Sequence, residues 1–237
     1  MNNLPAYVSM TFISIVIATF GFIYFFINKA KDKNKDQLAM VVSVFLAAWL
    51  FVVAILSINE FFLKFDSMPP RFLLMIIPPL LAIALLFYND QSRAFIKNIP
   101  ITTLTYIHII RVPVEIVLWW LFSAGLVPKM ITFEGGNYDI LSGVSAPFVA
   151  IFMVGLRSKS RISAIIWNFI ALALLINVVV HAILSTPTPI QLLSFDSPNT
   201  AVFYFPFVWL PAFVVPAVLF AHIASLVKLF AVTDDVK

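Results

Sequence analysis

The chain has 237 residues, of which 62% are hydrophobic and only 11% are charged, and its mean hydropathy is +1.03. A soluble domain carries about 45–50% apolar and about 25% charged residues. A chain of this length could not bury so much apolar surface in water, so we predict an all-α, polytopic integral membrane protein that is surrounded by the lipid bilayer. We ascribe the formal net charge of +4 to membrane topology and expect no nucleic acid partner, and the lack of cysteine excludes disulfides and thiolate chemistry.

Apolar runs that are long enough to cross a bilayer recur along the whole chain. A helix needs about 20 apolar residues to span roughly 30 Å of hydrocarbon. By this criterion we predict one domain, residues 1–237, that forms a bundle of seven transmembrane helices. The first apolar run lacks a basic leader and is too long for the apolar region of a cleaved signal peptide. The predicted spans are about 7–27, 38–58, 71–88, 101–124, 139–156, 163–184 and 201–230.

The distribution of Lys and Arg among the connecting segments predicts the orientation of this bundle. With the N-terminus outside, eleven cations fall on the inner side and three on the outer side, with Arg111 inside the membrane. We therefore expect the N-terminus outside and the C-terminus in the cytoplasm, in a bacterial cytoplasmic (inner) membrane. The inner cations are Lys29, Lys31, Lys33, Lys35, Arg93, Lys97, Arg157, Lys159, Arg161, Lys228 and Lys237, and the outer ones are Lys64, Arg71 and Lys129.

The fourth predicted span contains three ionisable residues in an otherwise apolar sequence. His108, Arg111 and Glu115 are spaced i, i+3 and i+7, so they share one stripe of a helix. Arg111 and Glu115 are four residues apart, and we predict an ion pair between them. A charge at the bilayer centre costs at least about 2.5–3.5 kcal/mol, so this stripe is expected to face the interior of the bundle. Pro113 leaves the carbonyl of Ile109 without its helical donor and predicts a kink.

Two later spans carry polar residues at depths that match those in the fourth. With a rise of about 1.5 Å per residue, His108 and His222 both lie roughly 10 Å from the inner boundary. Asn177 and His181 share one face of the sixth span, near the predicted level of Glu115. We therefore expect an inner cluster of His108 and His222 and an outer cluster of Glu115, Asn177 and His181. The alternative is that each histidine is a hydrogen-bonded packing residue.

The predicted outer connections supply a second set of acidic and amide side chains. Asp139 is the first residue of the predicted span 139–156 and Asn199 lies two residues before the span 201–230, and both are positions where an N-cap belongs. The same connections could instead form a hydrated vestibule or a cation site at the outer face. The outer-loop candidates are Glu60, Glu134, Asn137, Asp139, Asp196 and Asn199.

The last predicted span is interrupted by Pro206, Pro211 and Pro216. Each proline removes one helical N–H, so this segment is expected to be kinked or to begin as an interfacial stretch before the true span. Broken helices of this kind are common at transporter sites.

The interior polar residues favour binding of a small molecule. The first hypothesis is a protein that binds or transports a small polar or amphipathic molecule at a site on the fourth, sixth and seventh spans. Arg111 would pair with an anionic group of the ligand, and Glu115 would act as its counter-charge or as a proton acceptor. The ligand-binding candidates are Arg111, Glu115, His108, Asn177, His181 and His222.

Other functional classes remain open at this point. One is a haem-binding electron carrier with His108 and His222 as axial ligands. Another is a membrane-embedded enzyme acting on an apolar or lipid substrate with Glu115 or a histidine as general base, and a third is a non-catalytic subunit of an oligomer or membrane complex. The spacing of residues identifies neither a catalytic set nor a metal site. Retinal is excluded because every lysine lies in a loop or at a helix end.

Overall fold

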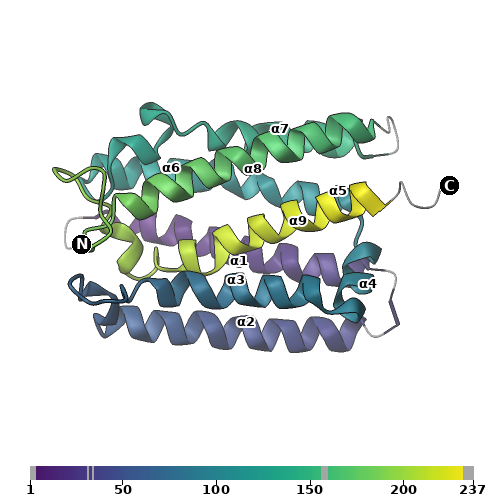
Figure 1. Cartoon of the computed structure of the whole chain (residues 1–237), viewed down its shortest axis with the longest axis horizontal. Coiled ribbons are helices and arrows are strands. Elements are labelled where there is room, and N and C mark those ends of the chain that lie inside the picture. Colours follow the sequence, from purple (N-terminus) through teal and green to yellow (C-terminus); the bar gives the residue numbers. More distant parts are fainter. Residues whose placement is uncertain (1–3, 31, 34, 156–159, 232–237) are drawn as a thin grey trace.

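The computed structural model describes residues 4–30, 32–33, 35–155 and 160–231, and over these residues it contains helices and no strands. Figure 1 shows the long helices side by side along the longest axis, with α1 beginning at one end of the bundle and α9 ending at the other. The all-helical class that we predicted is therefore confirmed for the described part of the chain.

Five helical segments are long and apolar enough to cross a membrane. They are α1 (Ala6–Lys29), α2 (Lys35–Ile58), the segment Ile101–Ser123, α8 (Arg161–Leu184) and the segment Leu210–Ala231. A sixth is obtained if α3 (Leu73–Tyr88) and α4 (Asp90–Asn98) are taken together, although these two helices meet at an angle of 89°. These long apolar helices indicate an integral membrane protein.

The predicted count of seven spans is not confirmed by helix length. A helix, α7 (Asp139–Phe152), does occupy the predicted fifth span, but its 14 residues cover only about 21 Å, short of the roughly 30 Å of hydrocarbon. In the predicted third span, 71–88, the observed helix α3 is also short, because it has 16 residues before the bend. The predicted seventh span begins too early, since residues 201–209 form a short helical turn and a loop and the long helix starts at Leu210.

Two of the long segments contain turns that are not α-helical. Segment Ile101–Ser123 consists of α5 (Ile101–Tyr106), the 3-10 turn η2 (Ile107–Ile110) and α6 (Arg111–Ser123). The carbonyl of Ile109, which Pro113 leaves without its α-helical donor, lies in this 3-10 turn. The final segment begins with the π-helical turn η6 (Leu210–Val214), which leads into α9 (Val215–Ala231). Four short 3-10 turns lie in the connections: η1 (Phe61–Leu63), η3 (Lys129–Ile131), η4 (Phe133–Gly135) and η5 (Ala201–Phe203).

Helix α4 was not expected from the sequence, which predicted a loop between the third and fourth spans. The side chain of Asn89 accepts a hydrogen bond of 3.0 Å from the backbone N–H of Ser92 and so caps the helix. At the other end, Nζ of Lys228 on α9 donates to the carbonyl of Lys97 at 2.8 Å and also to the carbonyl of Ile99. These bonds hold α4 across the end of α9.

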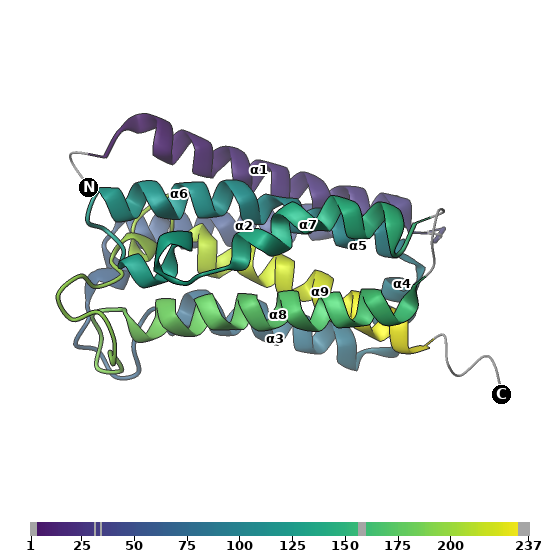
Figure 2. The ribbon, with the colours of Figure 1, turned by 90° about the horizontal axis from the view of Figure 1, so that it is seen from above.

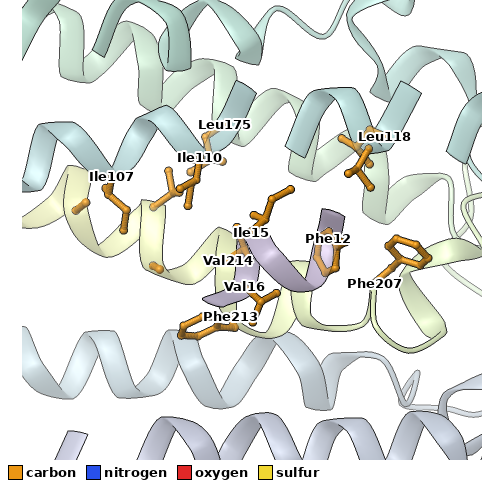
Figure 3. Packing of buried hydrophobic residues seen from close by; sticks show 14 of the residues in the cluster. Phe12, Ile15, Val16, Ile107, Ile110, Leu118, Leu175, Phe207, Phe213 and Val214 are labelled. Carbon is orange, nitrogen blue, oxygen red and sulfur yellow. The ribbon is translucent and has the colours of Figure 1, made fainter. Parts of the chain in front are cut away.

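The apolar core lies where α1, α6 and the final segment meet. In Figure 3, Phe12 and Val16 of α1 lie beside Phe207 and Phe213, and the rings of Phe12 and Phe207 are 5.3 Å apart between centroids. Figure 2 shows α1 along one side of the bundle and both α3 and α8 along the opposite side. In Figure 1, α9 runs between α3 and α8, so these two helices border the same face with α9 between them.

Candidate functional site

The interior polar cluster is built around Arg111, at the start of α6. Its guanidinium forms a forked ion pair with Asp139: Nε donates to Oδ2 at 2.7 Å and Nη2 donates to Oδ1. Nη2 also donates to the carbonyl of Ala171 at 2.9 Å, and Nη1 lies 3.2 Å from Nε2 of His222. Arg111 and Asp139 are only 3% and 4% exposed. One side chain thereby connects α6, α7, α8 and α9.

The predicted ion pair between Arg111 and Glu115 is wrong, because Asp139 takes the guanidinium. Two parallel N–H groups of the fork meet both carboxylate oxygens of Asp139, the arrangement that gives the strongest arginine–carboxylate bonds. The predicted capping role of Asp139 is wrong for the same reason. The side chain that accepts a bond from the first N–H of α7, at 3.0 Å, is that of Asn137.

Glu115 is buried on the same side of α6 but has a different partner. Its Oε1 accepts a hydrogen bond of 2.7 Å from Nδ2 of Asn137, and the same amide donates to the carbonyl of Ile131 at 3.0 Å. Its Oε2 is buried and has no hydrogen-bond partner among the described residues. Within the described part of the chain, Glu115 therefore has one carboxyl oxygen that no hydrogen bond engages.

The two interior histidines meet, as their predicted depths suggested. The rings of His108 and His222 are both fully buried, and their centroids lie 4.0 Å apart at an angle of 33°. Because Arg111 can only donate, Nε2 of His222 accepts its bond, and Nδ1 therefore carries the proton and donates to Oδ1 of Asn168 at 3.0 Å. Both ring nitrogens of His108 lack a hydrogen-bond partner within the described residues.

This histidine pair does not fit the ligation of a haem. Axial histidines face each other across the iron with the flat macrocycle between them. Here the rings of His108 and His222 lie against each other, with Trp167 packed edge-on to His108 at 5.3 Å between centroids. Both nitrogens of His222 are engaged by Arg111 and Asn168. The described residues also contain no group of three or more His, Cys, Asp or Glu that could hold a metal ion.

The expected outer cluster of Glu115, Asn177 and His181 does not form. The buried stripe of α8 runs through Ala164, Asn168, Ala171 and Leu175, and at 100° per residue Asn177 and His181 point to the other side of the helix. Nδ1 of His181 lies 2.8 Å from the carbonyl of Asn177, within the same helix.

The outer-loop candidates separate into three groups. Asn137 and Asp139 belong to the interior cluster, whereas Glu60, Glu134 and Asp196 are exposed. Glu134 accepts a bond of 2.9 Å from the indole N–H of Trp119. Asn199 is buried, and its predicted role as a helix cap is wrong. Its backbone N–H donates to the carbonyl of Ser185 at 2.8 Å and its amide donates to the carbonyl of Ala182 at 3.1 Å, which ties the outer loop to the end of α8.

A cavity of about 250 Å³ lies next to this cluster. Its walls are almost entirely aliphatic and come from α3, α6, α8 and the final segment, and Glu115, Arg111 and Asp139 are among its lining residues. The lining also reaches the outside of the bundle, where Leu80 of α3 is 40% exposed and Val180 of α8 is 45% exposed. The cavity thus extends from the buried carboxyl of Glu115 to the side of the bundle, where it reaches the surface between α3 and α8.

Comparison with known protein families gives a match. Residues 69–230 match the model of a family described as a domain of unknown function, DUF8737. The chain belongs to this family. No curated protein and no solved structure matches the chain.

The part of the chain that matches DUF8737 contains the whole interior cluster and the cavity. It begins just before α3 and ends within α9, so it includes Arg111, Glu115, Asp139 and His222, while α1 and α2 precede it. Because α1 contributes Phe12 and Val16 to the core beside Phe207, the DUF8737 segment and the preceding helices pack as one bundle.

Several residues of the interior polar cluster were not predicted from the sequence. Asn168 orients His222, and Trp167 packs against His108 while its N–H donates to Ser145 at 2.9 Å. The predicted span 163–184 contains two asparagines, and Asn168, an amide between the aromatic residues Trp167 and Phe169, was a usable signal that was not followed. The hydroxyls of Ser142 and Ser225, three residues after Asp139 and His222, are buried without a partner in the described part of the chain.

Proposed function

We propose that this protein resides in a membrane and binds a small amphipathic molecule in the cavity between α3 and α8, with the polar group of the ligand at Glu115. The observation that carries this proposal is a cavity with aliphatic walls that ends at a buried carboxyl whose Oε2 has no partner within the described residues. A buried polar atom without a partner carries a desolvation cost of about 1–3 kcal/mol, which a hydrogen-bond donor on a ligand would relieve.

The hydrogen bonds that Arg111 already makes bear on which polar group the ligand carries. Its guanidinium is already bonded to Asp139, Ala171 and His222, so it has little capacity left for an anionic ligand. Asp139 also balances the charge of Arg111, so that within the described interior cluster Glu115 is the acid group that has no ion pair. The favoured ligand is therefore an apolar molecule with an amine or hydroxyl head, and the role of Arg111 is to fix four helices around the site.

The position of the opening favours entry from the bilayer. The exposed lining residues Leu80 and Val180 lie on helices α3 and α8, whose outer faces would contact hydrocarbon in a membrane. A molecule that partitions into the bilayer could reach Glu115 without crossing water. The cavity is close to the lower end of the range of about 300–1,000 Å³ that is usual for ligand pockets, so a ligand with a single short chain is favoured.

The same proposal includes the topology. We infer seven crossings in a cytoplasmic membrane, with the N-terminus outside and α3 and α7 as short crossings. Charge supports this orientation, since the end of the bundle that holds Lys29, Lys35 and Lys97 is the more basic one.

A competition assay on the detergent-purified protein tests the proposed ligand class. Radiolabelled decylamine is the probe, and unlabelled decanol and decanoate are the competitors. Decylamine and decanol should bind, and decanoate should compete at least about tenfold more weakly, since its carboxylate is a desolvated anion that has no hydrogen bond to donate to Oε2 of Glu115. Glu115→Ala should weaken decylamine binding by about tenfold or more, and Val179→Trp, which fills the cavity, should abolish it.

Glu134→Ala is the matched control, because it removes an exposed acid that lies outside the cavity. This variant should bind decylamine like the wild type. Equal binding of decanoate and decylamine, or unchanged binding by a folded Glu115→Ala variant, would refute the proposed site.

A further inference from the structure

A second groove lies at the opposite end of the molecule from the outer loops, between α4 and α9. It has a volume of about 860 Å³ and is separate from the cavity at Glu115. Its apolar part is lined by Phe87, Ala94, Ile223, Leu226, Val227 and Phe230, and its polar rim by Asp90, Arg93 and Lys97.

The geometry of α4 places this rim where a membrane would end. Helix α4 turns by 89° from α3, so a bundle that crosses the bilayer would hold α4 along the membrane surface. Its residue Ile96 is buried against the bundle, while Arg93 and Lys97, four residues apart, are exposed on one face. An amphipathic helix with this division of residues is typical of the interface between headgroups and acyl chains.

The charges of the rim favour a ligand with one negative charge. Arg93 forms an ion pair with Asp90, and Lys97 adds a cation one turn further on, so the rim has a net charge of one positive unit. Lys228 is not available for the same role, because its ammonium group already donates to the carbonyls of Lys97 and Ile99.

The end of the bundle that surrounds the groove also has a positive net charge. Among the described residues, seven cations and three acids lie at this end of the bundle, whereas the opposite end carries three cations and four acids. At this end they are Lys29, Lys33, Lys35, Arg93, Lys97, Arg161 and Lys228 against Asp32, Asp36 and Asp90, and at the other end Lys64, Arg71 and Lys129 against Glu60, Asp66, Glu134 and Asp196.

From these observations we propose that the groove between α4 and α9 binds an anionic phospholipid. The phosphodiester lies at Arg93 and Lys97, and one acyl chain lies along Leu226 and Phe230 on α9. Basic pockets beside transmembrane helices suit such headgroups, and each Lys or Arg near the membrane surface contributes an attraction of about 1 kcal/mol, or roughly fivefold in affinity.

Native mass spectrometry of the full-length protein tests this proposal. The protein is released from nanodiscs that contain equal amounts of phosphatidylglycerol and phosphatidylcholine with identical chains, and the retained lipids are counted. The wild type should retain phosphatidylglycerol in preference to phosphatidylcholine. Arg93→Gln combined with Lys97→Gln should lower that retention by at least about fivefold.

Two further variants separate a built site from general charge attraction. Lys64→Gln combined with Lys129→Gln removes two exposed cations at the opposite end and should leave retention unchanged. Leu226→Trp keeps every charge but fills the apolar part of the groove and should also reduce retention.

Three outcomes would overturn the proposal. The first is equal retention of the two lipids by the wild type, and the second is an equal loss in both double variants. The third is a folded Leu226→Trp variant that retains phosphatidylglycerol normally, because the acyl chain would then lie elsewhere. None of these results bears on the Glu115 cavity, so the two proposals fail independently.

Discussion

The two interior histidines are alike in burial but differ in bonding. His222 accepts from Arg111 and donates to Asn168, while His108 is held by ring packing against His222 and Trp167 and has no hydrogen-bond partner in the described chain. Burial of an imidazole without partners contributes no hydrogen-bond energy, so the two rings should respond differently to the same substitution.

His108→Phe and His222→Phe form a matched pair that tests this difference. His222→Phe leaves an N–H of Arg111 and the oxygen of Asn168 unpaired and should lower the free energy of unfolding by about 1–3 kcal/mol. His108→Phe keeps an aromatic ring in the stack and should be neutral or slightly stabilising. Thermal unfolding in detergent measures both, and equal destabilisation by the two changes would contradict this view of His108.

Interior residues also show what a linear sequence can and cannot predict. The shared level of His108 and His222 was predictable because depth follows from the fixed rise of a helix, whereas their ring contact also depends on how α9 is rotated. The partner of Arg111 was not, because Glu115 is near in sequence while Asp139 comes near only through the packing of α7 on α6. The predicted contact of Asn177 with Glu115 was wrong for a related reason, because the depth of a residue says nothing about the rotation of α8 around its axis.

At the scale of elements, the position of α7 depends on a close approach at Gly143. A Cβ atom built on Gly143 would lie 2.8 Å from Cγ2 of Val112 and 3.2 Å from the carbonyl oxygen of His108. The helix therefore lies against the turn that joins α5 to α6. This contact sets the height at which Asp139, one turn earlier, meets Arg111.

Gly143→Ala should therefore push α7 away from α6. We expect a loss of about 1–3 kcal/mol in the free energy of unfolding, since overpacking of a tight contact costs this much. Gly21→Ala on α1 is the control: nothing lies within 4 Å of its Cβ position, so removing a helical glycine there should stabilise by about 0.5–1 kcal/mol. Chemical unfolding in mixed micelles distinguishes the two signs, and a neutral Gly143→Ala would show that α7 can shift freely.

The boundaries of elements were less predictable than their existence. Hydropathy located helices in all seven predicted ranges, yet it did not indicate that α7 would have 14 residues or that α3 would bend into α4. The bend lies at Asn89, whose side chain caps α4 through a local hydrogen bond. Hydropathy averaged over a window of residues cannot detect such a bond. For the last span, the prolines predicted either a kink or a separate stretch before the true span, and the structure has the second form: residues 201–208 are a short turn and a loop that contains Pro206.

At the scale of the whole molecule, the proposed orientation can be tested without removing any native thiol, because the chain has no cysteine. Lys64 lies in the connection between α2 and α3, and Lys33 lies at the opposite end between α1 and α2. With the N-terminus outside, Lys64→Cys should react with a membrane-impermeant maleimide in intact cells. Lys33→Cys should react only after the cells are permeabilised, and the reverse pattern would invert the proposed topology.

The single arginine that connects α6, α7, α8 and α9 has a mechanical consequence. Directional hydrogen bonds join those four helices, whereas α3, whose sequence is apolar apart from Tyr88, contacts the bundle mainly through apolar packing. We therefore expect the wall of the cavity formed by α3 to yield more easily than the wall formed by α8, which Arg111 bonds at Ala171. A ligand larger than the cavity would be accommodated by a tilt of α3, while α6, α7, α8 and α9 keep their positions.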